Sequence, residues 1–335
     1  MVLTRGARIT GAVVCALLAL IAASWIARDL NTADGPNQLW KFWESGSSGV
    51  GQIFLATTLY DLVLVVVYVA VAVAAVRSPL AAQALVAAAV ITLAIRLPSL
   101  WVARAGWARP WSVDDLRDRA LWSALAALVG ALVLLIVAAA GRRGLAGEYD
   151  EDDRVPTRPS LGAGITAFIF LGVAGCAALA WEGWSADRVI GVSWSAYGHR
   201  FTGESGIYMP LLGVPVGWLN VALGVLGLVA AIAAVVRAHF SRPLGLVVAL
   251  VLAGMGGLFL SVALRDKLLS RLGDLNTESQ LIVLTQLFYL LAGVVVLLVL
   301  ARRGVRDEPG IRQAPAWRQQ PGFGPPPPSS PPPGW

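Results

Sequence analysis

Eight long apolar runs alternate with short polar segments along the 335-residue chain. Each run is about 20 residues long, the length that an α-helix needs to cross a hydrocarbon layer about 30 Å thick. Helices are expected because an open sheet would leave backbone groups unpaired in lipid. The pattern therefore predicts an all-α integral membrane protein with helices at 9–26, 52–76, 80–103, 120–140, 161–181, 213–236, 244–264 and 280–301.

The eight runs fall into two halves that resemble each other. Short motifs recur in the same order and at nearly constant spacing: SPL at 78–80 with RPL at 242–244, DL at 115–116 and 274–275, and RRG at 142–144 and 302–304. Since each half crosses the membrane an even number of times, the two halves share one orientation. We predict two parallel four-helix repeats, at 1–140 and 161–303, joined by a cytoplasmic linker at 141–160.

The remaining segment, 304–335, is a proline-rich tail that ends in FGPPPPSSPPPGW. Such a sequence cannot bury an apolar core and favours extended polyproline conformations, so we expect it to be disordered. Two interpretations stay open. The tail is either a solvated extension or a docking ligand for an aromatic-lined groove on a partner.

Composition excludes a soluble globular protein, because 57% of the residues are hydrophobic, 14% are charged and the mean hydropathy is +0.70. The net charge of +6 would fit a nucleic-acid-binding protein, but the basic residues are scattered at the ends of the apolar runs. We therefore expect membrane lipid and no nucleic acid as a partner. Arginines beside the ends of the runs, such as Arg77, Arg237 and Arg242, favour a plasma-membrane protein with both termini in the cytoplasm.

With that orientation, all but two of the 13 tryptophans fall at or beside the outer face. An ordinary aromatic belt would occupy both interfaces. We predict an outer aromatic cap whose rings either anchor the helix ends or bind a lipid, a glycan or a protein of the cell envelope. Its main members are Trp40, Trp43, Trp107, Trp111, Trp184 and Trp194.

Two opposite charges lie well inside the predicted crossings, Asp61 and Arg96. Each would cost about 3 kcal/mol at the centre of a membrane helix, so we expect them to pair. Counting about 1.5 Å per residue from the predicted helix ends places both at depths of about 10 to 12 Å. The two predicted helices form a tight hairpin, so residues at similar depth on them lie close together.

Each charge shares a helix face with other polar residues, Thr57 and Tyr68 beside Asp61 and Thr92 beside Arg96. The hypothesis is an intramembrane polar site in the outer leaflet, beneath the cap. The alternative is a buried ion pair that only fixes helix packing, or an Arg96 that reaches to the surface. Residues of the second half at similar depth complete the candidate site: Asn220, Gln286 and Tyr289.

Other motifs carry little chemistry. GAGITA at 162–167 fits a dinucleotide-binding pattern but opens a membrane helix with no preceding strand. The acids of the linker fit a charged loop, and His199 has no second ligand at metal-binding spacing. Cys15 and Cys176 lie inside apolar runs and fit buried thiols. We predict no catalytic residue, no metal and no cofactor.

Three functions remain open. The one we favour is a non-catalytic accessory or scaffolding protein of the cell envelope, with partners at its outer loops or tail. The second is a transporter or permease-like protein that recognises a small polar or amphipathic solute near Asp61 and Arg96. The third is a membrane enzyme acting on lipid-linked substrates with acids of the outer loops, such as Asp114, Asp115, Glu182 and Glu204.

Overall fold

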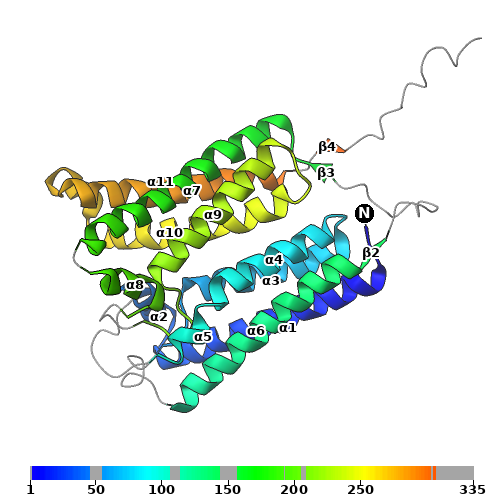
Figure 1. The fold of residues 1–335 in the computed structure, drawn as a ribbon, viewed down its shortest axis with the longest axis horizontal. Coiled ribbons are helices and arrows are strands. Elements are labelled where there is room, and N and C mark those ends of the chain that lie inside the picture. Colours follow the sequence, from blue (N-terminus) through cyan, green and yellow to red (C-terminus); the bar gives the residue numbers. More distant parts are fainter. Residues whose placement is uncertain are drawn as a thin grey trace, which may run out of the picture.

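Eight helices of the computed structural model are long and apolar enough to cross a membrane, as predicted (Figure 1). The structure describes residues 2–45, 55–105, 114–143, 157–191, 193–204, 209–302 and 305–306. The spanning helices are α1 (Arg5–Thr32), α3 (Leu59–Arg77), α4 (Ala81–Arg96, continued by α5, Ser99–Val102), α6 (Asp114–Ala140), α7 (Leu161–Ile190), α9 (Val216–Val235), α10 (Ser241–Arg265) and α11 (Thr277–Ala301).

The spanning helices form two groups of four that lie side by side (Figure 1). In the first group, α1 and α4 each pack against α3 and α6. In the second group, α7 and α10 each pack against α9 and α11, so the same neighbours recur. Helix α10 also contacts α3 and α4, and one apolar core contains residues from both groups.

Many large apolar side chains point outward from these bundles, among them Leu20, Ile136 and Leu298. Helices that are apolar on all sides need an apolar environment around them, which agrees with a multi-pass membrane protein. Small residues bring helices of the second group close together. A Cβ at Gly256 would lie 2.4 Å from the backbone nitrogen of Leu290, and one at Gly293 would lie 2.5 Å from that of Ala253.

The two ends of the bundle differ. At one end, which we call the cap end, lie the short helices α2 (Pro36–Ser45) and α8 (Trp194–Thr202), α5 and the 3₁₀-helix η2 (Leu268–Asp274) (Figure 1). Helices α2 and α8 and η2 fall in segments that the sequence pattern marks as polar loops, and α5 falls in the last part of the helix predicted at 80–103. At the opposite end, which we call the linker end, lie the beginnings of α1 and α7 and the ends of α6 and α11.

Four two-residue strands tie the linker end together. Strand β1 (Val2–Leu3) precedes α1 and pairs with β2 (Arg142–Arg143), which follows α6. Strand β3 (Thr157–Arg158) precedes α7 and pairs with β4 (Val305–Arg306), which follows α11. Both pairings are antiparallel, so each bundle joins the start of its first helix to the end of its last helix.

Several helix bounds differ from those predicted, with consequences for the candidate site. Helix α3 begins at Leu59 instead of residue 52. Helix α4 ends at Arg96, two residues before Pro98, because proline has no N–H with which to continue the helix hydrogen bonds. Helices α1 and α7 extend past their apolar runs, to Thr32 and Ile190. Most of the predicted linker, 144–156, and of the predicted tail, 307–335, lies outside the described residues.

Candidate functional site

Asp61 and Arg96 meet in an ion pair, in which Arg96 Nη2 donates to Asp61 Oδ1. The Asp61 side chain is fully buried and Arg96 is 4% exposed. Their positions along the two helices differ from those predicted. Asp61 lies in the first turn of α3 and Arg96 in the last turn of α4, because both helices are shorter at this end than their apolar runs.

This position gives each charge a second partner in the backbone. Asp61 Oδ2 accepts from the N–H of Thr58 at 2.7 Å, which completes a capping box at the start of α3. A carboxylate at a helix N-terminus and a guanidinium at a helix C-terminus also both complement the helix dipoles. The pair therefore closes the cap end of the α3–α4 hairpin.

Little free volume surrounds this pair. Tyr68 Oη and Thr92 Oγ1 lie 2.8 Å apart and hydrogen bond, and Arg96 Nη1 lies 3.5 Å from the carbonyl oxygen of Leu212. The cavity that Arg96, Tyr68 and Leu212 help to line has a volume of only about 10 Å³. This is room for no more than one water molecule. The arrangement binds helices together and leaves no space for a solute.

Thr57 does not join this cluster. It lies in the extended segment before α3, where its N–H and hydroxyl both donate to Asp29 Oδ2, at 2.7 and 2.6 Å. The N–H of Ala56 donates to the same oxygen, and Arg28 pairs with the other one. Asp29 is a fully buried acid in the last turns of α1, and it holds the segment that leads into α3.

The cap end of the second half contains a different charged cluster, centred on Glu182. This side chain is 4% exposed and belongs to α7, not to the loop predicted at 182–212. Arg200 of α8 donates to both carboxylate oxygens, at 3.0 and 2.8 Å, and Asn220 of α9 donates to one of them at 3.1 Å. Burial, followed by the charge on Glu182, raises the pKa of the nearby Tyr197, so its phenol remains protonated.

Beside this cluster opens a cavity of about 350 Å³, which we call the cap-end cavity. Its polar lining includes Asn220, Gln286 and Tyr289, three residues of the predicted site, together with Tyr60 from the first half. Its apolar lining includes Leu219, Met255 and Ile282 from three helices of the second half. The predicted site is therefore divided: Asp61 and Arg96 lie with Tyr68 and Thr92 in a packed cluster of the first half. Asn220, Gln286 and Tyr289 line an open cavity of the second half.

The lining defines what this cavity can bind. Arg200 reaches its edge, but the guanidinium is neutralised by Glu182, and the other polar groups are amides and hydroxyls. Trp181 Nε1 donates to Thr285 Oγ1 at 3.1 Å, which joins α7 to α11 along the same wall. A mostly apolar wall with a few uncharged hydrogen-bonding groups suits an amphipathic molecule with a neutral polar head.

The tryptophans of the predicted cap also differ between the two halves. The ring centroids of Trp40 and Trp43, both of α2, lie 6.2 Å apart. Trp40 Nε1 donates to Ser261 Oγ of α10 at 3.0 Å, which joins the two halves. Trp184 and Trp194 are exposed, at 50% and 72%. Trp107 and Trp111 lie outside the described residues.

Other candidate acids offer no site for acid–base catalysis. Asp114 and Asp115 are highly exposed and pair with Arg117 and Arg119 on the same helix. Glu204 lies 3.5 Å from His199 on the surface. Among the residues that the structure describes, no three His, Cys, Asp or Glu side chains are grouped to hold a metal ion.

Two tryptophans that sequence reasoning did not assign to the site, Trp101 and Trp218, connect the halves. Trp101 and Trp218 meet edge to face at 5.4 Å. Trp218 Nε1 donates to the carbonyl of Ala94 at 2.7 Å, and Trp101 Nε1 donates to that of Phe201 at 3.0 Å. The cap end is thus cross-linked by indole hydrogen bonds around the two charged clusters.

No family model, curated protein or solved structure matches this chain.

Proposed function

We propose that the protein is a non-catalytic accessory protein of the plasma membrane that holds an amphipathic molecule with a neutral polar head in its cap-end cavity. The observation that carries the proposal is the cavity itself, whose lining combines the polar residues Gln286, Asn220 and Tyr289 with apolar ones such as Met255 and Leu219. Such a lining matches a molecule that partitions into lipid and still needs hydrogen bonds.

The transport alternative has less support from the geometry. Its expected site near Asp61 and Arg96 is filled by the ion pair and the Tyr68–Thr92 hydrogen bond. The enzyme alternative lacks an unengaged carboxylate in the cavity, because Glu182 is held by Arg200 and Asn220. A binding or scaffolding role needs neither a path across the membrane nor an acid.

A photoreactive monoacylglycerol with a short acyl chain would test this role. Its neutral glycerol head can accept and donate hydrogen bonds, and its chain fits the apolar wall. We expect the probe to label peptides of α9 and α11, and we expect this labelling to fall about tenfold in Gln286→Leu. The variant removes the amide, so the head group would be buried without its hydrogen-bond partner. The matched control is Gln38→Leu, an exposed residue of α2 at the same end of the molecule.

Equal labelling of both variants, or labelling spread over all lipid-facing helices, would show that the cavity does not bind the probe. Movement of the probe across proteoliposome membranes, lost in Gln286→Leu, would instead assign the cavity to a transporter.

We also propose that the linker end faces the cytoplasm, with both termini inside. The support is its charge: Arg77, Arg237 and Arg242 lie beside helix ends there, and positive residues are enriched on the cytoplasmic side. Labelling of introduced cysteines tests the orientation. Ser195→Cys in α8 should react with an impermeant reagent on intact cells, and Ser160→Cys should react only after permeabilisation. The reverse pattern would invert the topology.

The two four-helix groups are proposed to descend from a duplication. Three features support this: the recurring helix neighbours, the strand pair at the linker end of each group, and matching N-caps. Thr4 accepts a hydrogen bond from the N–H of Ala7 at the start of α1, and Ser160 accepts one from that of Ala163 at the start of α7. The cap end, with Trp40 and the exposed Trp194, is the surface proposed to meet an envelope partner. The Pro-rich tail is the alternative contact, on the cytoplasmic side.

A further inference from the structure

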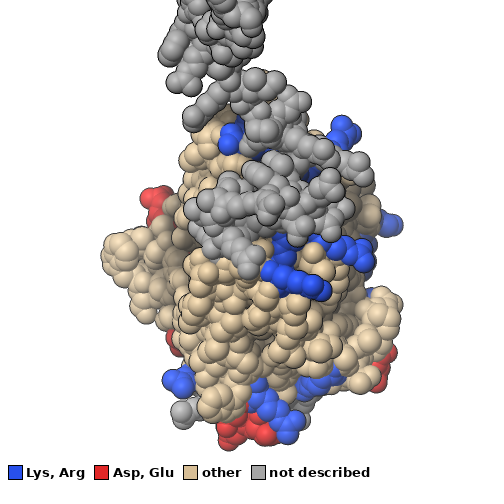
Figure 2. Space-filling model, turned by 90° about the vertical axis from the view of Figure 1, so that its right-hand side faces the viewer, with Lys and Arg blue, Asp and Glu red and all other residues tan. Residues whose placement is uncertain are grey.

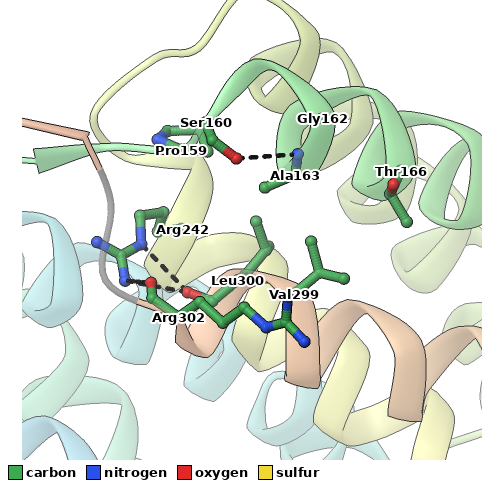
Figure 3. A pocket seen from close by; sticks show the side chains of 9 residues that line it. All are labelled: Pro159, Ser160, Gly162, Ala163, Thr166, Arg242, Val299, Leu300 and Arg302. Atoms are coloured by element: carbon green, nitrogen blue, oxygen red, sulfur yellow. Dashed lines mark hydrogen bonds between the residues drawn. The ribbon is translucent and has the colours of Figure 1, made fainter.

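A second cavity, of about 380 Å³, opens at the linker end of the second half, and we call it the linker-end cavity (Figure 3). The beginning of α7 forms one side, with Ser160, Gly162 and Thr166. The end of α11 and the beginning of α10 form the other, with Arg302 and Arg242. Between the arginines and α7 the walls are apolar, since Ala163, Val299 and Leu300 also line the cavity.

Among the described residues, the charge at this end of the molecule is one-sided. Every Asp and Glu among the residues that the structure describes belongs to the cap end, in or beside the helix termini found there. The linker end contributes Arg77, Arg237, Arg242 and Arg302, and Figure 2 shows Lys and Arg side chains spread over the described part of this face. An anion that reaches the linker-end cavity therefore meets no described carboxylate there.

Arg242 is fixed in place by the end of α11. Its Nε and Nη2 donate to the carbonyl of Leu300 at 3.2 and 3.1 Å, and Nη2 donates to that of Arg302 at 2.6 Å (Figure 3). These bonds satisfy carbonyls that a helix end leaves without partners and keep a positive charge at the edge of the cavity. The side chain of Arg302 is exposed and supplies the second charge.

The start of α7 adds donors on the opposite side. Ser160 caps the N–H of Ala163 at 3.2 Å, which leaves the N–H groups of the first two helical residues without a partner inside the helix. A Cβ built on Gly162 would meet no atom within 4 Å, so the backbone there borders open space. The N-terminus of a long helix attracts anions, and here it lies across the cavity from two arginines.

The corresponding place in the first half is filled. The N–H of Thr4 donates directly to the carbonyl of Gly141 at 2.9 Å, and Leu3 is 5% exposed. A Cβ at Gly141 would lie 2.4 Å from that of Ala7. In the second half the β3–β4 pairing is joined by Arg242 of α10, whose side chain bonds the end of α11, and the space between α7 and α11 remains open.

From these observations we infer that the linker-end cavity binds a phosphate group between Arg242, Arg302 and the start of α7, and that a membrane phospholipid carries this phosphate. Arginine forks and helix N-termini both recognise phosphate oxygens. Basic pockets between membrane helices on the cytoplasmic side suit anionic head groups, and the apolar lining residues Ala163, Val299 and Leu300 suit the lipid part of such a molecule. This site is separate from the cap-end cavity and does not depend on the function proposed for it.

Native mass spectrometry of the full chain tests the site with phosphatidylglycerol and with diacylglycerol of the same acyl chains, which lacks the phosphate. We expect phosphatidylglycerol to be retained in preference and Arg302→Gln to weaken its binding about tenfold, the effect of losing a charge-assisted hydrogen bond. The control is Arg77→Gln, which removes an exposed arginine at the same end but in the first half. Its lipid binding should be unchanged.

Gly162→Trp provides a test that leaves the charge unaltered. The residue borders open space, so the indole should enter the cavity and displace the phospholipid without loss of folding. Inorganic phosphate is the second probe: its competition at low millimolar concentration would keep the phosphate site but assign it to a soluble phosphate compound. Equal retention of the two lipids, or equal losses in Arg302→Gln and Arg77→Gln, would overturn the inference.

Discussion

The two halves of this protein use the same helix neighbours to build different interiors. In the first half, a buried ion pair fills the cap end around a cavity of about 10 Å³, and Leu3 fills the linker end. In the second half, cavities of about 350 and 380 Å³ open at the two ends. The difference shows that one arrangement of four helices can be closed or open at its ends, depending on which side chains occupy them.

The largest expected effect is the loss of one member of the packed ion pair. Arg96→Gln leaves Asp61 buried without its charge partner, which should lower the free energy of unfolding by about 3 to 5 kcal/mol. Unfolding in mixed detergent micelles would measure it. The double variant with Asp61→Asn should recover part of the loss, because it removes the unpaired charge.

Asp115→Asn serves as the control for this variant, because its salt bridge with Arg119 is highly exposed. Its effect should stay below about 1 kcal/mol. If Arg96→Gln were as mild as Asp115→Asn, the description of the first half as closed by a packed ion pair would be wrong.

The next largest difference between the halves is expected for substitutions that add side-chain volume. Ala131 of α6 is fully buried in the shared core on the side of the first half, so Ala131→Leu should lower the free energy of unfolding by about 1 to 3 kcal/mol. Met255→Phe adds volume beside the cap-end cavity and should change stability by less than about 1 kcal/mol. Equal losses for the two variants, measured by the same unfolding assay, would show that the cavity is not free to accept a side chain.

The smallest effects belong to the tryptophans of the cap end. Ser261→Ala removes the hydroxyl that accepts from Trp40 between the halves and should cost about 1 kcal/mol. Trp194→Ala removes a ring that is 72% exposed and should stay within about 0.5 kcal/mol, while reducing contact with any envelope partner. A larger stability loss for Trp194→Ala would move this ring from the surface role to a packing role.

The apolar pattern was enough to predict eight membrane helices, because lipid permits few other structures. Helix ends were harder to predict, and this affected the site. Asp61 belongs to the first turn of α3 because it completes the capping box with Thr58, and a hydropathy run does not detect such a cap. Sequence reasoning also extended the polar face of α3 back to Thr57, a residue that bonds Asp29.

Asp29 and Glu182 were missed as buried acids because α1 and α7 continue beyond their apolar runs. A signal for Glu182 was nevertheless present. Ala174, Ala178 and Glu182 follow one another at four-residue spacing, so the acid continues the small, buried face of α7. The open space in the second half depends on how distant segments are arranged, such as Tyr60 and α11, which line the same cavity, and no local pattern encodes this.

The strand pairs at the linker end limit how each bundle can move. A helix that slid along its neighbour by one turn would travel about 5.4 Å, more than a two-residue antiparallel pairing can follow without breaking. Piston-like motion of the first helix of a bundle against the last is therefore locked at one end. Tilting of one bundle against the other is opposed at the opposite end, where it would have to break the indole hydrogen bonds of Trp40 and Trp218 between the halves.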